Sequence, residues 1–126
     1  MNDLEYIASR TTEEAALRQI AEEAAELAQA ALKLCRVIKK DSPTPINVEQ
    51  AIKNLLEEIG DVQLTLNVWV GKYSSFSKAT VVENIEQVVS YKSKRWADRL
   101  KAEENKPKEG EENAEEDKQQ SKGCTL

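Results

Sequence analysis

The chain of 126 residues contains no histidine. This absence excludes zinc sites built on imidazole, Ser-His-Asp triads and Cys-His dyads. It also excludes a ferritin-type di-iron protein, whose metal ligands come in Glu-x-x-His pairs. Any chemistry must therefore depend on carboxylates, lysines, arginines or a bound metal.

Other features are scarce as well. The only two cysteines, Cys35 and Cys124, do not make a secreted disulfide scaffold. No apolar run is long enough to cross a bilayer, and residues 1–10 show no signal-peptide pattern. The net charge of −5 argues against binding to nucleic acid or to a membrane surface. We therefore expect a cytoplasmic protein with neither of these partners.

Helix breakers are few, with four glycines and three prolines in the chain. Apolar residues recur at spacings of three and four over 11–40, 47–71 and 80–100, which predicts three amphipathic helices. A short segment at 3–8 is expected to add one helical turn. The fold class predicted from this pattern is all-α.

The expected helix ends carry recognisable signals. Thr11 with Glu14, and Asn47 with Gln50, have the spacing of capping boxes at the starts of two helices. The proline-bearing stretch 41–45 separates these helices, because proline cannot continue a helix interior.

The domain organisation follows from a change in composition near residue 105. Residues 1–104 are expected to form one all-α domain, and 105–126, which lack an apolar period, a disordered acidic tail. Three long helices are too few to close a bundle of this length. We expect long antiparallel helices in a four-helix-bundle-type core completed by oligomerisation, as a homodimer or homotetramer. Alanines in 21–31 would permit close helix approach, although alanine is also simply the best helix former.

Two acidic clusters are the most informative feature of the chain. Glu23 with Glu26, and Glu58 with Asp61, are pairs of carboxylates three residues apart, so each pair shares one helix face. If the two helices face one another, four carboxylates surround one point. Like charges at that range need a cation or raised pKa values. With oxygen ligands alone, the expected cation is Mg²⁺ or Mn²⁺.

The alternative interpretation of these acids is a solvated acidic face. A solvated helix usually pairs acids with bases four residues later. Glu22 and Glu23 are instead followed at that spacing by Glu26 and Leu27. Unpaired acids beside an apolar face are costly without a counter-ion. Glu57 is expected to point away from the cluster and to be solvated. From spacing alone, both interpretations remain open.

The residues of both clusters resemble a known signature. The matching segments are Glu22-Glu23-x-x-Glu26-Leu27 and Glu57-Glu58-Ile59-Gly60-Asp61-Val62. They are similar to the motif of the MazG-like all-α nucleoside triphosphate pyrophosphohydrolases, over roughly residues 15–100. The interval between Glu26 and Glu58 is longer than the family usually shows, and we place the excess in the proline-bearing linker.

The resemblance implies hydrolysis of an NTP or dNTP between its α- and β-phosphates, which yields a nucleoside monophosphate and pyrophosphate and removes surplus or non-standard nucleotides. It implies Mg²⁺, with Mn²⁺ as a substitute, held by Glu23, Glu26, Glu58 and Asp61. Either Glu22 or Glu23 would accept a proton from the attacking water. Whether Glu22 is a base, a ligand or solvated stays open.

A cationic stripe is the expected phosphate contact. Lys92, Arg95 and Arg99 continue an apolar stripe of the last helix, and family members often carry a similar Lys-x-x-Arg element there. The alternative is a set of cations that favour the helix C-terminus and form salt bridges. Lys72 is a further, weaker phosphate candidate.

The base pocket is the least defined part of the expected site. Trp69 lies 11 residues after Glu58, about 16 Å along a helix, where it could stack on a nucleobase. It also completes an apolar stripe and could simply be core. Gln19 could read a base edge. The alternative to the enzyme as a whole is a non-enzymatic helical adaptor, whose apolar faces exist to bind a partner.

Overall fold

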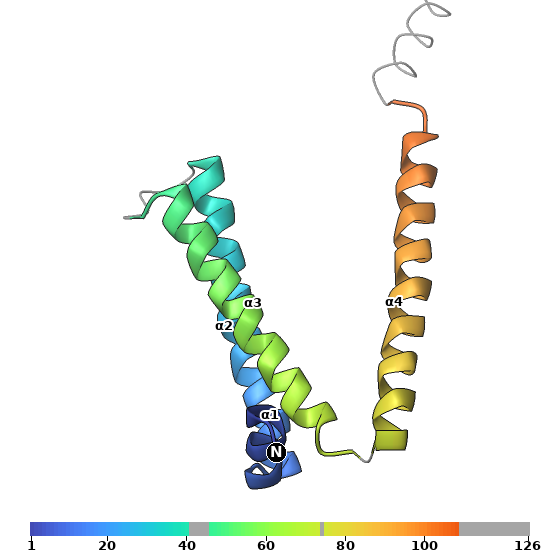
Figure 1. The fold of residues 1–126 in the computed structure, drawn as a ribbon. Helices are drawn as coiled ribbons and strands as arrows, with labels where there is room; N and C mark the ends of the chain where they lie inside the picture. The colour runs from blue at the N-terminus through green and yellow to red at the C-terminus, as the bar shows by residue number, and fades with distance from the viewer. Residues whose placement is uncertain (41–45, 74, 109–126) are drawn as a thin grey trace, which may run out of the picture. The chain divides into compact units, whose positions relative to one another are not determined.

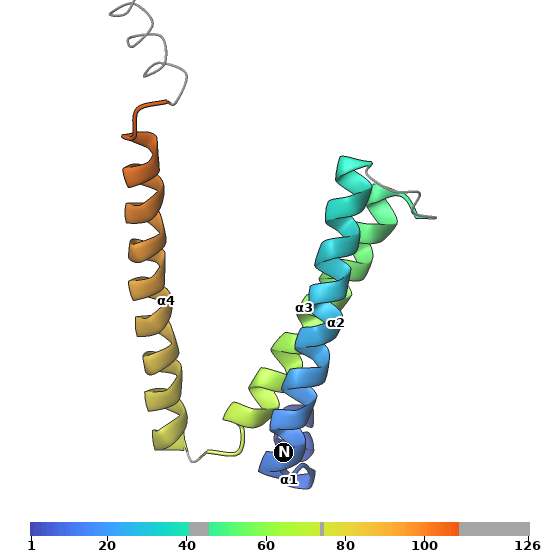
Figure 2. The ribbon, with the colours of Figure 1, turned by 180° about the vertical axis from the view of Figure 1, so that it is seen from behind.

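The computed structural model describes residues 1–40, 46–73 and 75–108. Within these residues the chain forms helices and no strand: α1 (Asp3–Arg10), α2 (Glu13–Lys39), α3 (Val48–Val70) and α4 (Ser75–Glu104). This confirms the all-α prediction. Helices α2 and α3 run side by side as a hairpin in both views (Figures 1 and 2). Among the described helices, none has an apolar stretch of the length that a bilayer requires.

The chain divides into two compact units, Met1–Val82 and Glu83–Leu126, and the division falls inside α4. The first unit holds α1, α2 and α3. In the second unit, the described part is the remainder of α4 and residues 105–108. Most of the tail predicted for 105–126 lies outside the described residues.

The predicted capping signal agrees with the start of α3 but not with the start of α2. At α3, the side chain of Asn47 accepts a hydrogen bond from the backbone N–H of Gln50 at 2.8 Å. At α2, the cap is Thr12, which accepts from the N–H of Ala15, and not Thr11 as predicted. The reason is α1: the hydroxyl of Thr11 donates to the carbonyl of Ile7 at 2.8 Å, at the end of that helix.

The start of α4 was also predicted wrongly. The apolar period suggested Thr80, whereas the helix begins at Ser75. No proline or glycine lies between these residues, so nothing in the sequence prevents the helix from extending toward its N-terminus. The expected turn near the N-terminus is a full helix, α1, closed by a capping box between Asn2 and Glu5.

The buried residues of the first unit are small. Ala8, Ala16, Ala51 and Val68 are at most 4% exposed, and Thr65 is 8% exposed. Small side chains let helix backbones approach closely, so this core is thin. Among the described residues, no large side chain is fully buried.

Helix α1 is fastened to the end of α3. A Cβ atom added at Gly71 would lie 3.1 Å from the Cβ of Ala8, so the absence of a side chain there allows this close approach. The ammonium group of Lys72 donates to the carbonyl of Ala8 at 2.9 Å and also to the carbonyl of Thr11. Both acceptors lie at the C-terminal end of α1, where carbonyls lack partners within the helix.

The apolar faces of the long helices are only half covered. On α3, Ile52 is 42% exposed, Ile59 43% and Leu66 40%. On α4, Ile85 is 48% exposed and Trp96 65%. These residues belong to the stripes that the sequence analysis expects to pack in a bundle core. Each helix therefore keeps apolar surface that a further partner could cover.

Candidate metal centre on the α2 and α3 pair

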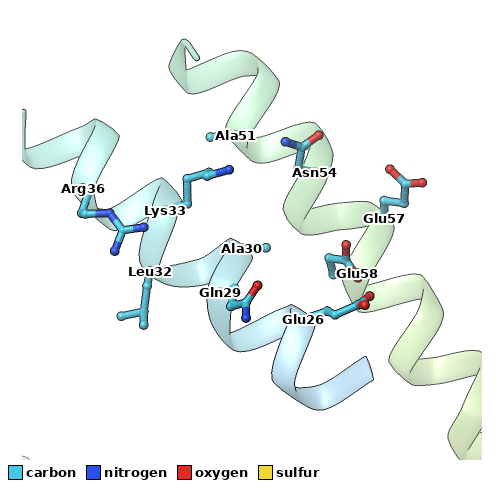
Figure 3. Close-up of a pocket in the computed structure, with 10 residues that line it drawn as sticks. All are labelled: Glu26, Gln29, Ala30, Leu32, Lys33, Arg36, Ala51, Asn54, Glu57 and Glu58. Carbon is cyan, nitrogen blue, oxygen red and sulfur yellow. The ribbon is translucent and has the colours of Figure 1, made fainter. Parts of the chain in front are cut away.

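Three carboxylates meet where the middles of α2 and α3 face one another. Glu23 and Glu26 extend from α2 and Glu58 from α3, and one carboxylate oxygen of each lies within 4.8 Å of those of the other two. Figure 3 shows Glu26 and Glu58 reaching toward one another across the two helices. The structure thus brings together three of the four expected metal ligands.

Asp61 lies close enough to act on the same cluster electrostatically. Its negative charge contributes to raising the pKa of both Glu23 and Glu58. Asp61 is half-buried on α3, three residues after Glu58, and therefore shares its face. Glu22 and Glu57 are exposed, and Figure 3 shows the carboxylate of Glu57 directed away from Glu26 and Glu58.

The cluster is electrostatically unsatisfied. One oxygen of Glu23 and one of Glu58 are buried with no hydrogen-bond partner among the described residues. Burial raises the pKa of Glu23 above its ordinary value, and the negative charges of Glu26 and Asp61 raise it further. Burial is also the largest cause that raises the pKa of Glu58, followed by the charges of Glu26 and Asp61. Like charges held together in this way favour either protons or a cation.

The donor set fits a hard divalent cation. Every candidate ligand is a carboxylate oxygen, which suits Mg²⁺, Mn²⁺ or Ca²⁺ better than zinc or copper. The orphaned oxygens of Glu23 and Glu58 are the specific observation behind this fit, because a bound cation would give each of them a partner.

A groove extends from the carboxylates along α2 and α3. It has a volume of about 550 Å³. Glu26 and Glu58 lie at one end, and Lys33 and Arg36 of α2 line the other (Figure 3). The amide side chains of Gln29 and Asn54 are also among its lining residues.

None of these four groove residues was predicted to belong to the site. A signal was present, because Lys33 lies seven residues after Glu26, or two helical turns along the same face. Asn54 likewise lies four residues before Glu58. Following each acidic face for two further turns would have identified Lys33 and Asn54.

Lys72 and Trp69, two of the predicted site residues, contact α1 and Tyr73 respectively. The ammonium group of Lys72 is engaged by the end of α1, as described above. The indole ring of Trp69 is half-buried and meets the ring of Tyr73 edge-on, with centroids 5.3 Å apart. Its N–H is buried with no acceptor among the described residues. Gln19 is exposed on α2. Roles in base recognition stay predictions for both Trp69 and Gln19.

The cationic stripe lies on the second unit. Lys92, Arg95 and Arg99 are all exposed on α4. The guanidinium of Arg95 lies 5.8 Å from the centre of the Tyr91 ring, a cation–π contact within the helix. The ion pair found within α4 joins Lys94 and Asp98 at 3.0 Å, and neither residue belongs to the stripe. Phosphate binding by the stripe stays a prediction.

Comparisons with known proteins found no matching family model, curated protein or solved structure.

Proposed function

We propose that this chain is a Mg²⁺-dependent nucleoside triphosphate pyrophosphohydrolase of the MazG-like type. The observation that carries the proposal is the meeting of Glu23, Glu26 and Glu58, with two buried oxygens that lack partners. A cluster of this kind repels itself and is stabilised by a cation that also binds an anionic substrate. The reaction is the one that the resemblance to this family implies: cleavage between the α- and β-phosphates of an NTP or dNTP. The proposal includes a cytoplasmic location.

The proposed ligands of the metal are Glu23, Glu26, Glu58 and Asp61. When bound, magnesium neutralises phosphate charge and lowers the pKa of coordinated water. The contribution of the chain is to hold these carboxylates on two paired helices, so that the site needs little rearrangement.

The proton of the attacking water needs an acceptor near the cluster. Glu22 is exposed, precedes Glu23 and is not one of the three converging carboxylates, so it is available as a general base. The other candidate is an oxygen of Glu23 that a metal leaves free. The two roles separate experimentally: Glu22→Gln should lower turnover and keep metal binding, whereas Glu23→Gln should lower both.

The proposal includes a homodimer or homotetramer built on a four-helix-bundle-type core. It is supported by the half-exposed apolar residues of α3 and α4, such as Ile52, Ile59 and Ile85. Fully burying side chains of this kind contributes about 1.5–3 kcal/mol each. A second copy of the chain offers matching apolar faces in a closed, symmetric arrangement.

The test is incubation with a panel of NTPs and dNTPs in the presence of Mg²⁺, with monophosphate, pyrophosphate and orthophosphate measured separately. We expect equal amounts of monophosphate and pyrophosphate from at least one nucleotide, and none after removal of the metal. Release of orthophosphate with a diphosphate would contradict cleavage between the α- and β-phosphates.

A second candidate is a non-enzymatic helical adaptor. It is favoured by the same exposed apolar faces, which could bind a different protein. The adaptor requires no metal, so Mg²⁺ should not change its stability. The enzyme, in contrast, should be stabilised by Mg²⁺. Absence of turnover with every nucleotide, in folded protein with metal present, would favour the adaptor.

A further inference from the structure

The groove between α2 and α3 carries opposite charges at its two ends. Glu26 and Glu58 belong to the carboxylate cluster, and Lys33 and Arg36 provide two cations on the same helix pair (Figure 3). Its volume of about 550 Å³ falls in the range of small-molecule sites. A ligand that fits both ends would contact a metal cation at the carboxylate end. It would present negative charge to Lys33 and Arg36 at the other end.

The two cations are free to bind such a ligand. Across residues 1–40, 46–73 and 75–108, neither Lys33 nor Arg36 has an ion-pair partner within 4.0 Å. Both side chains are exposed. Among the described residues, Lys33 and Arg36 therefore do not serve as counter-ions for carboxylates of the same chain.

Both cations lie on the C-terminal side of the carboxylates along α2, and Lys33 shares the helix face of Glu26. Lys33 and Arg36 follow Glu26 by seven and ten residues, about 10 and 15 Å along the helix axis. Long side chains on a helix lean toward its N-terminus, which in α2 is the direction of Glu26. Figure 3 shows Lys33 reaching from α2 toward α3 across the groove.

The lining of the groove favours phosphate over a nucleobase. It contains no aromatic side chain among its described lining residues, so it offers no stacking surface for a base. Lysine and arginine are the side chains best suited to phosphate oxygens. The amide of Asn54, which accepts from the side chain of Gln50 at 2.8 Å, keeps its N–H groups as further donors.

We propose that Lys33 and Arg36 bind the β- and γ-phosphates of the substrate, which become the pyrophosphate product, along the groove between α2 and α3. This inference rests on the proposed function and adds the orientation of the nucleotide. The polyphosphate end lies toward the C-terminus of α2, and the nucleoside leaves the metal cluster in another direction. Product pyrophosphate is then held by two cations that the monophosphate does not contact.

The test uses the full chain and inorganic pyrophosphate with Mg²⁺ as the probe, measured directly by calorimetry and as a product inhibitor. In the double variant Lys33→Gln/Arg36→Gln, we expect binding of pyrophosphate to weaken by at least about tenfold, because charge-assisted hydrogen bonds are lost. Binding of the nucleoside monophosphate, measured in the same way, should stay the same. The matched control is Lys39→Gln/Lys53→Gln, which removes the same charge from exposed residues outside the groove lining.

Three results would overturn the inference. Pyrophosphate binding could be as tight in the double variant as in the control. Binding of the nucleoside monophosphate, measured by calorimetry, could weaken instead, which would place the nucleoside in the groove. The double variant could also lose its oligomeric state, which would make the two cations interface residues. Because calorimetry needs no turnover, these results are distinct from failure of the nucleotide panel, which would refute the proposed function itself.

Discussion

Helices α3 and α4 both carry an apolar stripe, yet they differ in how much of it is covered. Helix α3 has buried residues at Ala51, Thr65 and Val68 and packs against α1 and α2 in its own unit. No residue of α4 is buried among those whose side chains the structure describes, and Ile85 is 48% exposed. Most helical stability in proteins comes from packing an apolar face. Helix α3 therefore has packing partners within its own unit, whereas α4 keeps apolar surface that a partner could cover.

The largest effect that tests this contrast between α3 and α4 is expected from a substitution in α3. Glu58→Gln should lower turnover by at least about 100-fold, beyond the usual cost of losing a group that only supports a metal ligand. The side chain keeps its size but loses the charge that would bind a cation. Steady-state rates with the preferred nucleotide check this, with the exposed Glu49→Gln on the same helix as control. Equal rates in the two variants would remove Glu58 from the site.

The second prediction concerns stability. At a Mg²⁺ concentration about 100 times Kd, binding should add about 2.7 kcal/mol to the free energy of unfolding. This gain should vanish in Glu58→Gln. Without Mg²⁺ that variant should be at least as stable as the parent, because one of several repelling charges is gone. Urea unfolding with and without metal measures both effects. If Mg²⁺ raises the free energy of unfolding of Glu58→Gln as much as that of the parent, the proposed metal site is contradicted.

The third prediction concerns α4. Ile85→Asp places a charge in the apolar stripe and should weaken assembly by about 1 kcal/mol or more per subunit, because roughly half of the Ile85 side chain is exposed and could be buried by a partner. Sedimentation equilibrium would show a smaller mass at a given concentration. Ser90→Asp adds the same charge at an exposed polar residue of α4 and is the control. If Ile85→Asp has the same mass as the parent, α4 takes no part in assembly.

The fourth prediction separates two roles of Lys72. Its ammonium donates to carbonyls at the end of α1, so Lys72→Gln should lower the free energy of unfolding by about 0.3–1 kcal/mol. The KM for the triphosphate should not change. Lys53→Gln, on the exposed surface of α3, provides the comparison. A raised KM with unchanged stability would instead support the phosphate role suggested by the sequence.

The smallest effect is a dependence of stability on pH. The pKa of Glu23 and of Glu58 is raised in the folded chain, so the folded state binds these protons more readily than the unfolded state. Without metal, the free energy of unfolding should therefore rise as the pH falls from neutral through the raised pKa values. The gain should level off below the ordinary carboxyl value of about 4.3. Thermal unfolding at a series of pH values measures this effect. In the double variant Glu23→Gln/Glu58→Gln, the free energy of unfolding should not show this rise as the pH falls.

Much of the fold was predictable because it depends on local chemistry. The spacing of apolar residues located the long helices, and Asn47 marked the start of α3. The start of α2 was misplaced because Thr11 is used by α1, and that competition depends on where α1 ends. The start of α4 was misplaced because the apolar period begins later than the helix.

The site, like the fold, was predictable where it depends on local periodicity and unpredictable where it depends on tertiary contacts. That Glu23 and Glu26 share a face, as do Glu58 and Asp61, follows from helical periodicity alone. The engagement of Lys72 by the carbonyls of Ala8 and Thr11 did not follow, since those residues are more than 60 positions away in sequence.

The sequence by itself determined which residues form helices and which side chains share each helix face, because both follow from the 3.6-residue period and local capping. Only the tertiary structure decided the register of α2 against α3, that is, which residues along the two helices face one another. That register places Glu26 opposite Glu58 and opens the groove toward Lys33 and Arg36. It also leaves two carboxylate oxygens without a hydrogen-bond partner in the part of the chain that the structure describes. The physical reason is that register depends on how the small buried residues of this unit, such as Ala16, Ala51 and Val68, pack against neighbouring helices, and periodicity carries no information about it.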